Sequence, residues 1–316
     1  MNSNSASSGG THQPVLLAGP TAVGKSEVAL RLAELIGGEI VSFDSMQVYC
    51  GMDIGTAKPS PADRARVPHH LLDVVPVAKP FDAAQFVEHA RKAVDAIRRR
   101  DRTPILCGGT GLYFQAFLHG LREAPAADPG LRAELEKLPL EVLLRELRDG
   151  DPETYHRIDR RNPRRVIRAV EVLRLGGRPP SGQGANWRSG ETGQEPQPGH
   201  FGLERETGEL RLRIDRRVEE MFRAGLVEET RQLLAQGLET NRTAMQALGY
   251  RQVVEHLRGE RGLAETIELV KTRTRLYAKR QMTWFRRQLS LNWIALSPED
   301  TAGEVAARIA EAVGET

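Results

Sequence analysis

The chain has 316 residues, of which 40% are hydrophobic and 28% are charged, and this composition excludes a wholly disordered protein. Its length is enough for a sizeable core and for about two domains. The formal net charge is only +3, but the pI is about 9.0 and basic residues cluster at 98–102, 157–168 and 271–287. Such clusters can follow the phosphates of a nucleic acid, although a solvated helix face is the simpler explanation for any one of them.

Targeting signals and a disulfide framework are both missing from the sequence. Residues 1–13 are polar and small, and we expect a flexible tail without the basic start and apolar stretch of a secretory signal. No run of about 18 apolar residues occurs, so we expect no membrane-spanning helix. Cys50 and Cys107 are too few for a disulfide framework or a thiolate zinc site. We therefore expect a cytoplasmic protein with free thiols.

The first third of the chain alternates between strand and helix patterns. A short apolar run at 15–18 predicts a buried strand, and apolar positions at helical spacing predict a helix over 26–36. Further apolar segments at 39–43 and 104–107 predict two more strands, with a helix over 81–100 between them. This alternation favours an α/β fold with a parallel sheet flanked by helices and functional loops at the strand C-terminal ends.

The pattern changes after about residue 120. Residues 122–174 are charged and helical in pattern, and residues 176–200 are rich in Gly, Pro, Ser and Asn, which is typical of a long loop. A short strand is predicted at 210–214. Amphipathic helices are predicted beyond it, at 216–236, 251–257 and 264–288.

These patterns predict a domain organisation. After the tail, residues 14–120 and 205–316 form the α/β core with its C-terminal helices. Residues 121–204 form an inserted all-helical domain.

A phosphate-binding loop follows the first predicted strand and opens the first predicted helix. Its residues are Gly19, Pro20, Thr21, Ala22, Val23, Gly24, Lys25 and Ser26. The glycines let the backbone approach phosphate oxygens, the helix N-terminus offers free amides, and Lys25 reaches the terminal phosphate. Ser26 would then bind Mg²⁺. The alternative is a glycine turn that binds nothing; the motif indicates phosphate, not specifically ATP. The core is thus expected to be P-loop NTPase-like.

Asp44 ends the second predicted strand. If that strand lies beside the first one, as sequential strands usually do, Asp44 emerges next to the phosphate loop. A carboxylate there can act as a base. It can equally cap a turn or help to hold a metal, so the residue alone does not choose among these roles.

Longer motifs make the sequence resemble the bacterial tRNA dimethylallyltransferases, also called tRNA isopentenyltransferases. The motifs are GPTAVGKS (19–26), SFDSMQVYCGMDIGTAKP (42–59), PHHLLD (68–73), GGTGLYF (108–114), NPRRVIRAVEV (162–172), LGYRQ (248–252) and YAKRQMTWFR (277–286). The motifs span nearly the whole chain. The second and the last are the most specific, because few kinds of protein contain them. The resemblance implies transfer of a dimethylallyl group from dimethylallyl diphosphate to the N6 amine of the adenosine next to the anticodon.

The resemblance also implies roles for individual residues. Asp44 is expected to be the general base, because the adenine amine must lose a proton as the new C–N bond forms. Residues 19–26 bind the diphosphate, with Mg²⁺ on Ser26. Thr110 and Arg132 are expected near the reacting groups. Without the resemblance, Thr110 is as well explained as a helix N-cap, and Arg132 as a surface residue.

The resemblance implies tRNA contacts for the turn at 44–47, for the inserted domain at 164–168 and for the basic helix near the C-terminus. The implied residues are Asp44, Ser45, Met46, Gln47, Arg164, Arg165, Val166, Ile167, Arg168, Lys279 and Arg280. Acting on a stacked base requires taking it out of the stack, and single-stranded loops are held through phosphates and base edges. The aromatic residues Tyr277, Trp284 and Phe285 are assigned to packing, and His69 and His70 to structure. We expect a monomer.

Two other functions fit part of the sequence. A small-molecule or nucleotide P-loop kinase explains the phosphate loop and Asp44, but gives the Arg-rich helical segment and the basic C-terminal helix no role. A non-catalytic RNA-binding protein gives Lys25 no role, because folding alone does not require that residue.

Overall fold

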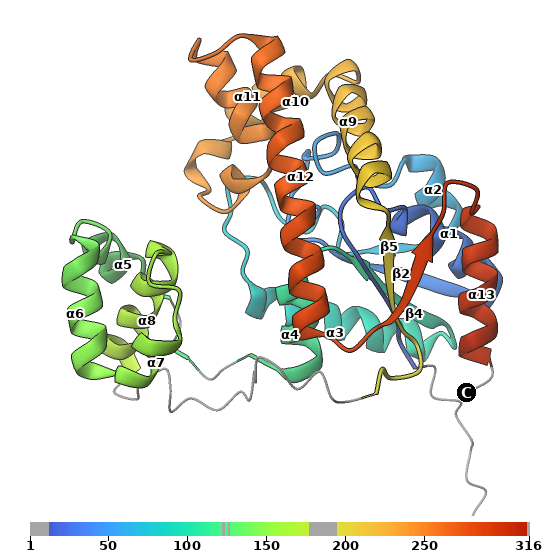
Figure 1. Cartoon of the computed structure of the whole chain (residues 1–316), viewed down its shortest axis with the longest axis horizontal. Helices are drawn as coiled ribbons and strands as arrows, with labels where there is room; N and C mark the ends of the chain where they lie inside the picture. Colours follow the sequence, from blue (N-terminus) through green and yellow to red (C-terminus); the bar gives the residue numbers. More distant parts are fainter. Residues whose placement is uncertain (1–12, 122–123, 126, 177–194, 315–316) are drawn as a thin grey trace, which may run out of the picture. The chain divides into compact units, whose positions relative to one another are not determined.

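The computed structural model describes residues 13–121, 124–125, 127–176 and 195–314 (Figure 1). The predicted tail, apart from Gln13, and most of the predicted loop at 176–200 lie outside these residues. The chain folds into two compact units. Residues up to Leu118 and from Ser189 onward belong to the first unit, and residues His119–Arg188 to the second. The second unit is thus an insertion in the sequence of the first.

The first unit is built on one parallel sheet of six strands. Its strands are β1 (Val15–Ala18), β2 (Gly38–Phe43), β3 (His69–His70), β4 (Thr103–Gly108), β5 (His200–Arg205) and β6 (Asn292–Leu296). They lie in the order β3-β2-β4-β1-β5-β6, and every pair is parallel. Strands β1, β2 and β4 are buried along their whole length. The predicted α/β class is confirmed.

The strand order corrects the expectation that β1 and β2 are neighbours. Strand β4 lies between them, with Gly108 opposite Ala18 on one side and Phe43 on the other. A Cβ atom added at Gly108 would lie 2.1 Å from the Phe43 carbonyl oxygen, so only glycine permits this close approach. The ends of β1 and β2 therefore open onto the same edge of the sheet, separated by one strand that ends in a glycine pair.

Helices flank this sheet, and the first unit contains most of them. They are α1 (Lys25–Ile36), α2 (Pro61–Arg66), α3 (Ala83–Arg99), α4 (Gly111–His119), α9 (Thr207–Arg223), α10 (Leu226–Ala235), α11 (Tyr250–Leu257), α12 (Leu263–Gln288) and α13 (Ala302–Gly314). Short 3₁₀ turns occur at Leu238–Thr240 and Ala244–Gln246. Helix α1 packs against α13, and α9 against α12. The core joins side chains of β1, α1, α9 and α13.

Three predictions for the C-terminal half are wrong. The strand predicted at 210–214 is part of α9, because Leu210, Ile214 and Val218 are buried at helical spacing although the segment also alternates. The helix predicted over 216–236 is two helices, separated at Gly225, whose φ of 104° is left-handed. The core resumes before residue 205, because β5 begins at His200 and pairs with β1. Strand β6 and helix α13 were not predicted.

The regular elements described in the second unit are all helices. Its elements are α5 (Pro129–Leu135), α6 (Leu140–Gly150), α7 (Pro152–Arg157) and α8 (Pro163–Gly176). Leu135, Leu143, Leu147, Val166 and Val170 form its small core.

Among the residues that the structure describes, no helix is long and apolar enough to cross a membrane.

Candidate active site

The phosphate loop connects β1 to α1 in the predicted way. Ala22 has a left-handed φ of 63° and Gly24, the N-cap of α1, a φ of 112°. Because glycine has no side chain to cap the helix, the first amides of α1 stay available to an anion. The helix dipole adds partial positive charge at the same place.

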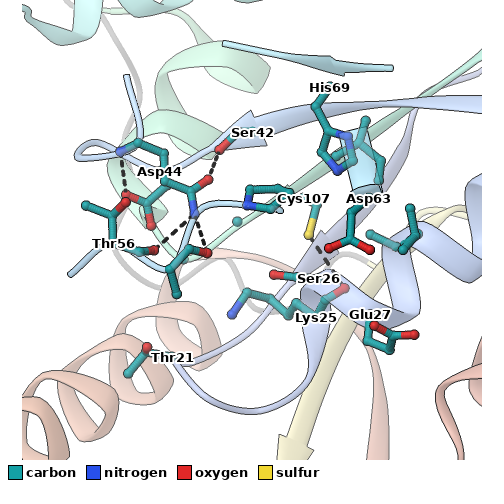
Figure 2. Close-up of a pocket in the computed structure, with 18 of the residues that line it drawn as sticks. Thr21, Lys25, Ser26, Glu27, Ser42, Asp44, Thr56, Asp63, His69 and Cys107 are labelled. Carbon is teal, nitrogen blue, oxygen red and sulfur yellow. Dashed lines mark hydrogen bonds between the residues drawn. The ribbon is translucent and has the colours of Figure 1, made fainter. Parts of the chain in front are cut away.

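A cavity of about 140 Å³ lies against this loop (Figure 2). Lys25 and Ser26 come from the start of α1, Asp44 from the end of β2, and Gly109 from the end of β4. Two helices from the far end of the chain complete the wall with Arg217, on α9, and Gln281, on α12. The structure thus brings the predicted phosphate-binding lysine and the predicted base into one cavity.

Burial controls the charge of Lys25. Its ammonium donates to the Pro20 carbonyl at 2.6 Å, so it reaches back over the start of the loop. Loss of hydration lowers its pKa to about 8, although the neighbouring Asp44 carboxylate acts in the opposite direction. Lys25 is therefore largely protonated at neutral pH but close to its titration point. An anion that enters the cavity will favour its charged form.

Asp44 sits in a turn that fixes one of its oxygens. Its Oδ1 accepts the backbone N–H of Met46 at 2.8 Å and that of Gln47 at 3.4 Å. Its Oδ2 has no protein partner among the residues that the structure describes. Asp44 therefore caps a turn, which was one alternative, and also faces the cavity (Figure 2). One carboxylate oxygen orients the group while the other remains able to accept a proton.

Thr110 supports this turn. Its hydroxyl oxygen accepts the Ser45 N–H at 3.0 Å, and it lies 3.4 Å from the Ser45 hydroxyl. Its carbonyl begins helix α4 by accepting the Tyr113 N–H at 2.9 Å. In this structure the Thr110 side chain holds the segment that carries Asp44.

Gln281 joins two loops and was not singled out in the sequence. Its Oε1 accepts the Thr21 N–H at 2.9 Å, and its amide nitrogen donates to the Gly109 carbonyl at 2.8 Å. It is buried. The long helix α12 is thereby tied both to the phosphate loop and to the end of β4. Gln281 does lie in the YAKRQMTWFR motif, which was the available signal.

Three arginines of the C-terminal half also approach the phosphate loop. Arg205, on β5, and Arg213, on α9, donate to the carbonyls of Val23 and Ala22, each at 2.9 Å. These two bonds hold the carbonyls of Val23 and Ala22 in the phosphate loop. Arg217 lines the cavity itself, where burial lowers its pKa and the Asp44 charge opposes that shift. Nothing in the sequence distinguished these arginines from the others on their elements.

The two adjacent histidines differ in role. His70 contacts Glu39, with its Nε2 2.7 Å from the carboxylate, and is structural as predicted. His69 also lines the cavity, while its Nδ1 lies 2.8 Å from the Val67 carbonyl. Burial lowers the pKa of His69, which favours its neutral form. No cluster of three or more His, Cys, Asp or Glu side chains suited to a metal occurs among the described residues.

The predicted tRNA residues of the first unit have different environments. Gln47 is turned inward, because its amide contacts Ser42, Thr56 and Ala57. Ser45 and Met46 are half-buried. Lys279 and Arg280 are exposed on α12.

The aromatic residues near that basic cluster were assigned to packing. Phe285 is fully buried, and the Trp284 ring lies over Gly111, where an added Cβ would be only 2.1 Å away. For Tyr277 the assignment was incomplete, because this residue lines the cavity.

In the second unit the predicted residues divide into core, ion-pair and surface positions. Val166, one of the residues implied to contact tRNA, is fully buried in the small core, and Ile167 packs against the same core. Arg164 and Arg165 are exposed in the first turn of α8.

Arg132 and Arg168 share one buried carboxylate. Both pair with Glu171, and Arg168 also donates to the Pro125 carbonyl at 2.7 Å. Burial alone would raise the pKa of Glu171, but its bonds with Arg168 and Arg132 hold it below its ordinary value. The Arg132 Nε is buried without a partner among the described residues. Arg132 is therefore more than the surface residue of the alternative explanation.

The sequence of this chain matches the model of one protein family. The model described as IPP transferase matches residues 47–288. The chain belongs to this family. It is 49% identical over 282 residues to the tRNA dimethylallyltransferase of Halorhodospira halophila, covering 87% of this chain and 90% of that protein. It is 46% identical over 280 residues to tRNA dimethylallyltransferase 1 of Citrifermentans bemidjiense, covering 89% and 91%.

Solved structures agree with this family assignment. The full-length tRNA isopentenylpyrophosphate transferase of Bacillus halodurans aligns with a TM-score of 0.68 and 36% identity, over 96% of this chain and 97% of that one. A eukaryotic dimethylallyltransferase described as acting on tRNA aligns with a TM-score of 0.76 and 26% identity, over 96% and 78%. The comparisons support the transferase interpretation and do not support the kinase alternative.

Proposed function

We propose that this family member transfers the dimethylallyl group of dimethylallyl diphosphate to the N6 amine of the adenosine 3′-adjacent to the anticodon, position 37 of tRNA. The observation that carries this proposal is the shared cavity of Lys25, Ser26 and Asp44, which combines an anion site with a free carboxylate oxygen. The class of reaction is proposed from the names of the relatives, and the role of each residue is proposed from its place in the cavity.

Asp44 is the general base of the proposed reaction. The N6 lone pair forms a bond to C1 of the dimethylallyl group, the C1–O bond breaks, and its electron pair leaves with the diphosphate. The proton on N6 passes to Oδ2 of Asp44. The turn bonds to Oδ1 orient the carboxylate without consuming the accepting oxygen.

The phosphate loop stabilises the departing diphosphate. Lys25 and the amides at the start of α1 supply positive charge where negative charge develops. Arg217 lines the same cavity and adds a second cation. In this low-dielectric setting such charges act more strongly than in water.

Mg²⁺ fits this donor set as an ion shared between protein and substrate. Protein sites for Mg²⁺ often provide one or two oxygens and leave the rest to waters and substrate phosphates. The Ser26 hydroxyl would hold it, and the carboxylates of Glu27 and Asp63 line the same cavity. When bound, the ion neutralises part of the diphosphate charge.

We further propose that the chain acts as a monomer and holds tRNA through exposed basic residues of both units. Arg164, Arg165, Lys279 and Arg280 are the exposed cations among the residues implied by the family.

The test is incubation of the purified protein with Mg²⁺, dimethylallyl diphosphate and unmodified tRNA that carries adenosine after the anticodon. Mass spectrometry of the digested nucleosides should find an adenosine that has gained one C₅H₈ unit. If no such nucleoside forms, and ATP is instead consumed with small acceptors, the kinase alternative replaces this proposal.

Diphosphate affinity should depend on pH through Lys25. Burial lowers the pKa of Lys25 to about 8, and a bound diphosphate favours the charged form, so binding takes up a proton above that pH. Affinity for inorganic diphosphate, measured by calorimetry, should fall about tenfold per pH unit above pH 8. The Lys25→Arg variant stays charged and controls for titration of the ligand. Equal pH dependence of both proteins would contradict the assignment.

The salt dependence of tRNA binding should identify the RNA contacts. Replacing Arg164, Arg165 and Lys279 together by Gln should reduce the slope of log K against log salt by about 2, because each single-strand phosphate contact contributes about 0.7. Filter binding between low and moderate salt measures this slope. A triple variant of Arg148, Arg231 and Arg258, which are exposed but paired with carboxylates, is the control. An unchanged slope in the first variant means that its three residues are ordinary surface residues.

A further inference from the structure

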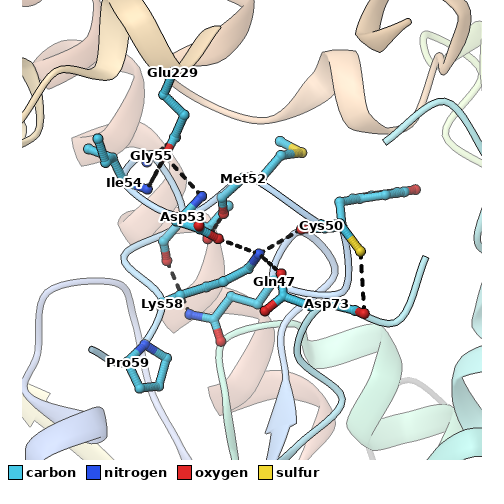
Figure 3. Close-up of polar contacts among 12 residues, drawn as sticks. Gln47, Cys50, Met52, Asp53, Ile54, Gly55, Lys58, Pro59, Asp73 and Glu229 are labelled. Carbon is cyan, nitrogen blue, oxygen red and sulfur yellow. Dashed lines mark hydrogen bonds and ion pairs between the residues drawn. The ribbon is translucent and has the colours of Figure 1, made fainter. Parts of the chain in front are cut away.

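Three consecutive backbone N–H groups in the loop after β2 converge on one carboxylate, that of Glu229 on α10 (Figure 3). The Ile54 N–H lies 2.8 and 3.1 Å from its two oxygens, and the Asp53 and Gly55 N–H groups lie 3.2 and 3.3 Å from one oxygen each. The Tyr250 hydroxyl donates to the same carboxylate at 2.5 Å. Converging backbone amides of this kind form an anion-binding concavity, which here holds a side chain of the protein itself.

The segment that Glu229 holds is also fixed from its other side. The Lys58 ammonium is buried and contacts the Tyr49 carbonyl at 2.6 Å and the carboxylates of Asp53 and Asp73 (Figure 3). Inside the segment, the Thr56 hydroxyl donates to the Met52 carbonyl at 2.6 Å. Residues 53–58 are thus held by the Glu229 carboxylate on one side and by the buried Lys58 ammonium on the other. Their backbone carbonyls therefore have fixed directions.

Those carbonyls orient Gln47. Its amide nitrogen donates to Thr56 at 3.1 Å and to Ala57 at 3.3 Å, and its Oε1 accepts the Ser42 hydroxyl at 2.7 Å. Gln47 and Ser42 line the same cavity as Asp44. The backbone N–H of Gln47 also donates to Asp44 Oδ1. A continuous chain of contacts therefore leads from Glu229, through residues 53–57 and Gln47, to the predicted base.

We propose that Glu229 is a positioning residue, which fixes the direction of the Asp44 carboxylate through Gln47. This inference rests on the proposed function, because it assigns Asp44 the role of base. Glu229 itself does not line the cavity, so its effect on Asp44 has to pass through the residues between them. Its removal should affect the chemical step more than substrate binding, since a shift of about 1 Å at a reacting group can cost about 100-fold in rate.

The experiment compares wild type, Glu229→Gln and Glu229→Ala in steady-state dimethylallyl transfer to tRNA. Glutamine keeps the shape but turns an amide N–H toward backbone donors. We expect kcat to fall about 10- to 100-fold, with the KM for dimethylallyl diphosphate and the Kd for tRNA within about threefold of wild type. Glu228→Gln, an exposed carboxylate on the same turn of α10, is the matched control and should behave as wild type. Losses that appear mainly in KM or Kd would overturn the proposal.

A double-mutant cycle separates positioning from a general loss of stability. Because Glu229 is proposed to act through Gln47, the double variant Glu229→Gln with Gln47→Ala should lose no more activity than the worse single variant, within about twofold. Multiplied losses would show independent effects and overturn the inference. A Glu229→Gln protein that turns over as wild type does would also overturn it. Failure of wild type to form the dimethylallyl nucleoside would instead refute the proposed function.

Discussion

Replacing Asp44 by Asn should reduce turnover by about 10²- to 10⁴-fold while leaving the fold and both substrates' binding nearly unchanged. The effect is large because a positioned base contributes a factor of this size, and an amide cannot accept the N6 proton. Asparagine keeps an oxygen for the Met46 and Gln47 N–H groups, so the turn should survive. Single-turnover transfer to tRNA measures the chemical step, and filter binding measures tRNA affinity.

Two further variants make the Asp44 result interpretable. Asp44→Ala removes the turn hydrogen bonds together with the base. The further loss of turnover relative to Asp44→Asn therefore measures the contribution of those bonds. Asp95→Asn changes an exposed carboxylate on α3 and should leave activity intact. If Asp44→Asn loses tRNA binding along with turnover, the residue has a structural role and the base must be sought elsewhere.

Replacing Lys25 by Ala should lower kcat/KM for dimethylallyl diphosphate by about 100- to 1000-fold, the usual cost of losing one preorganised donor to developing charge. Lys25 is the one basic residue of the loop sequence 19–26, and its ammonium donates to the Pro20 carbonyl. Calorimetry with inorganic diphosphate should show weaker binding, whereas tRNA affinity should not change.

The Lys25 result has a clear control. Lys92→Ala removes an exposed lysine that pairs with Glu88 on α3, and it should bind diphosphate as wild type does. Unchanged diphosphate binding by Lys25→Ala would mean that the loop holds the ligand by its amides alone. The stabilisation of the leaving group would then have to come from Arg217 or from Mg²⁺.

Local sequence patterns were sufficient to place the phosphate loop between a strand and a helix, and Asp44 at the end of a strand. Each lies within a few residues of the element that positions it. The strand order was not predictable in the same way. Nothing in the segments 15–18 and 39–43 indicates that β4 separates them, since pairing depends on contacts distant in sequence. The 210–214 segment fits both a strand and a helix pattern, and tertiary burial decided between them.

The residues that sequence reasoning missed reach the site from far along the chain. Gln281 contacts Thr21 across 260 positions, and Glu229 contacts Ile54 across 175. Arg217 is one of several arginines on α9, and only the fold distinguishes it by placing it at the cavity. These positions have no local signature, because their neighbours in space are not their neighbours in sequence.

The measurement that tests the central claim most directly is the release of inorganic diphosphate from dimethylallyl diphosphate by the wild-type protein. We predict one diphosphate released per tRNA modified, and none when tRNA is omitted or when the adenosine after the anticodon is replaced by guanosine. Diphosphate release that ignores this adenosine, or no release in the presence of competent tRNA and Mg²⁺, would contradict the account.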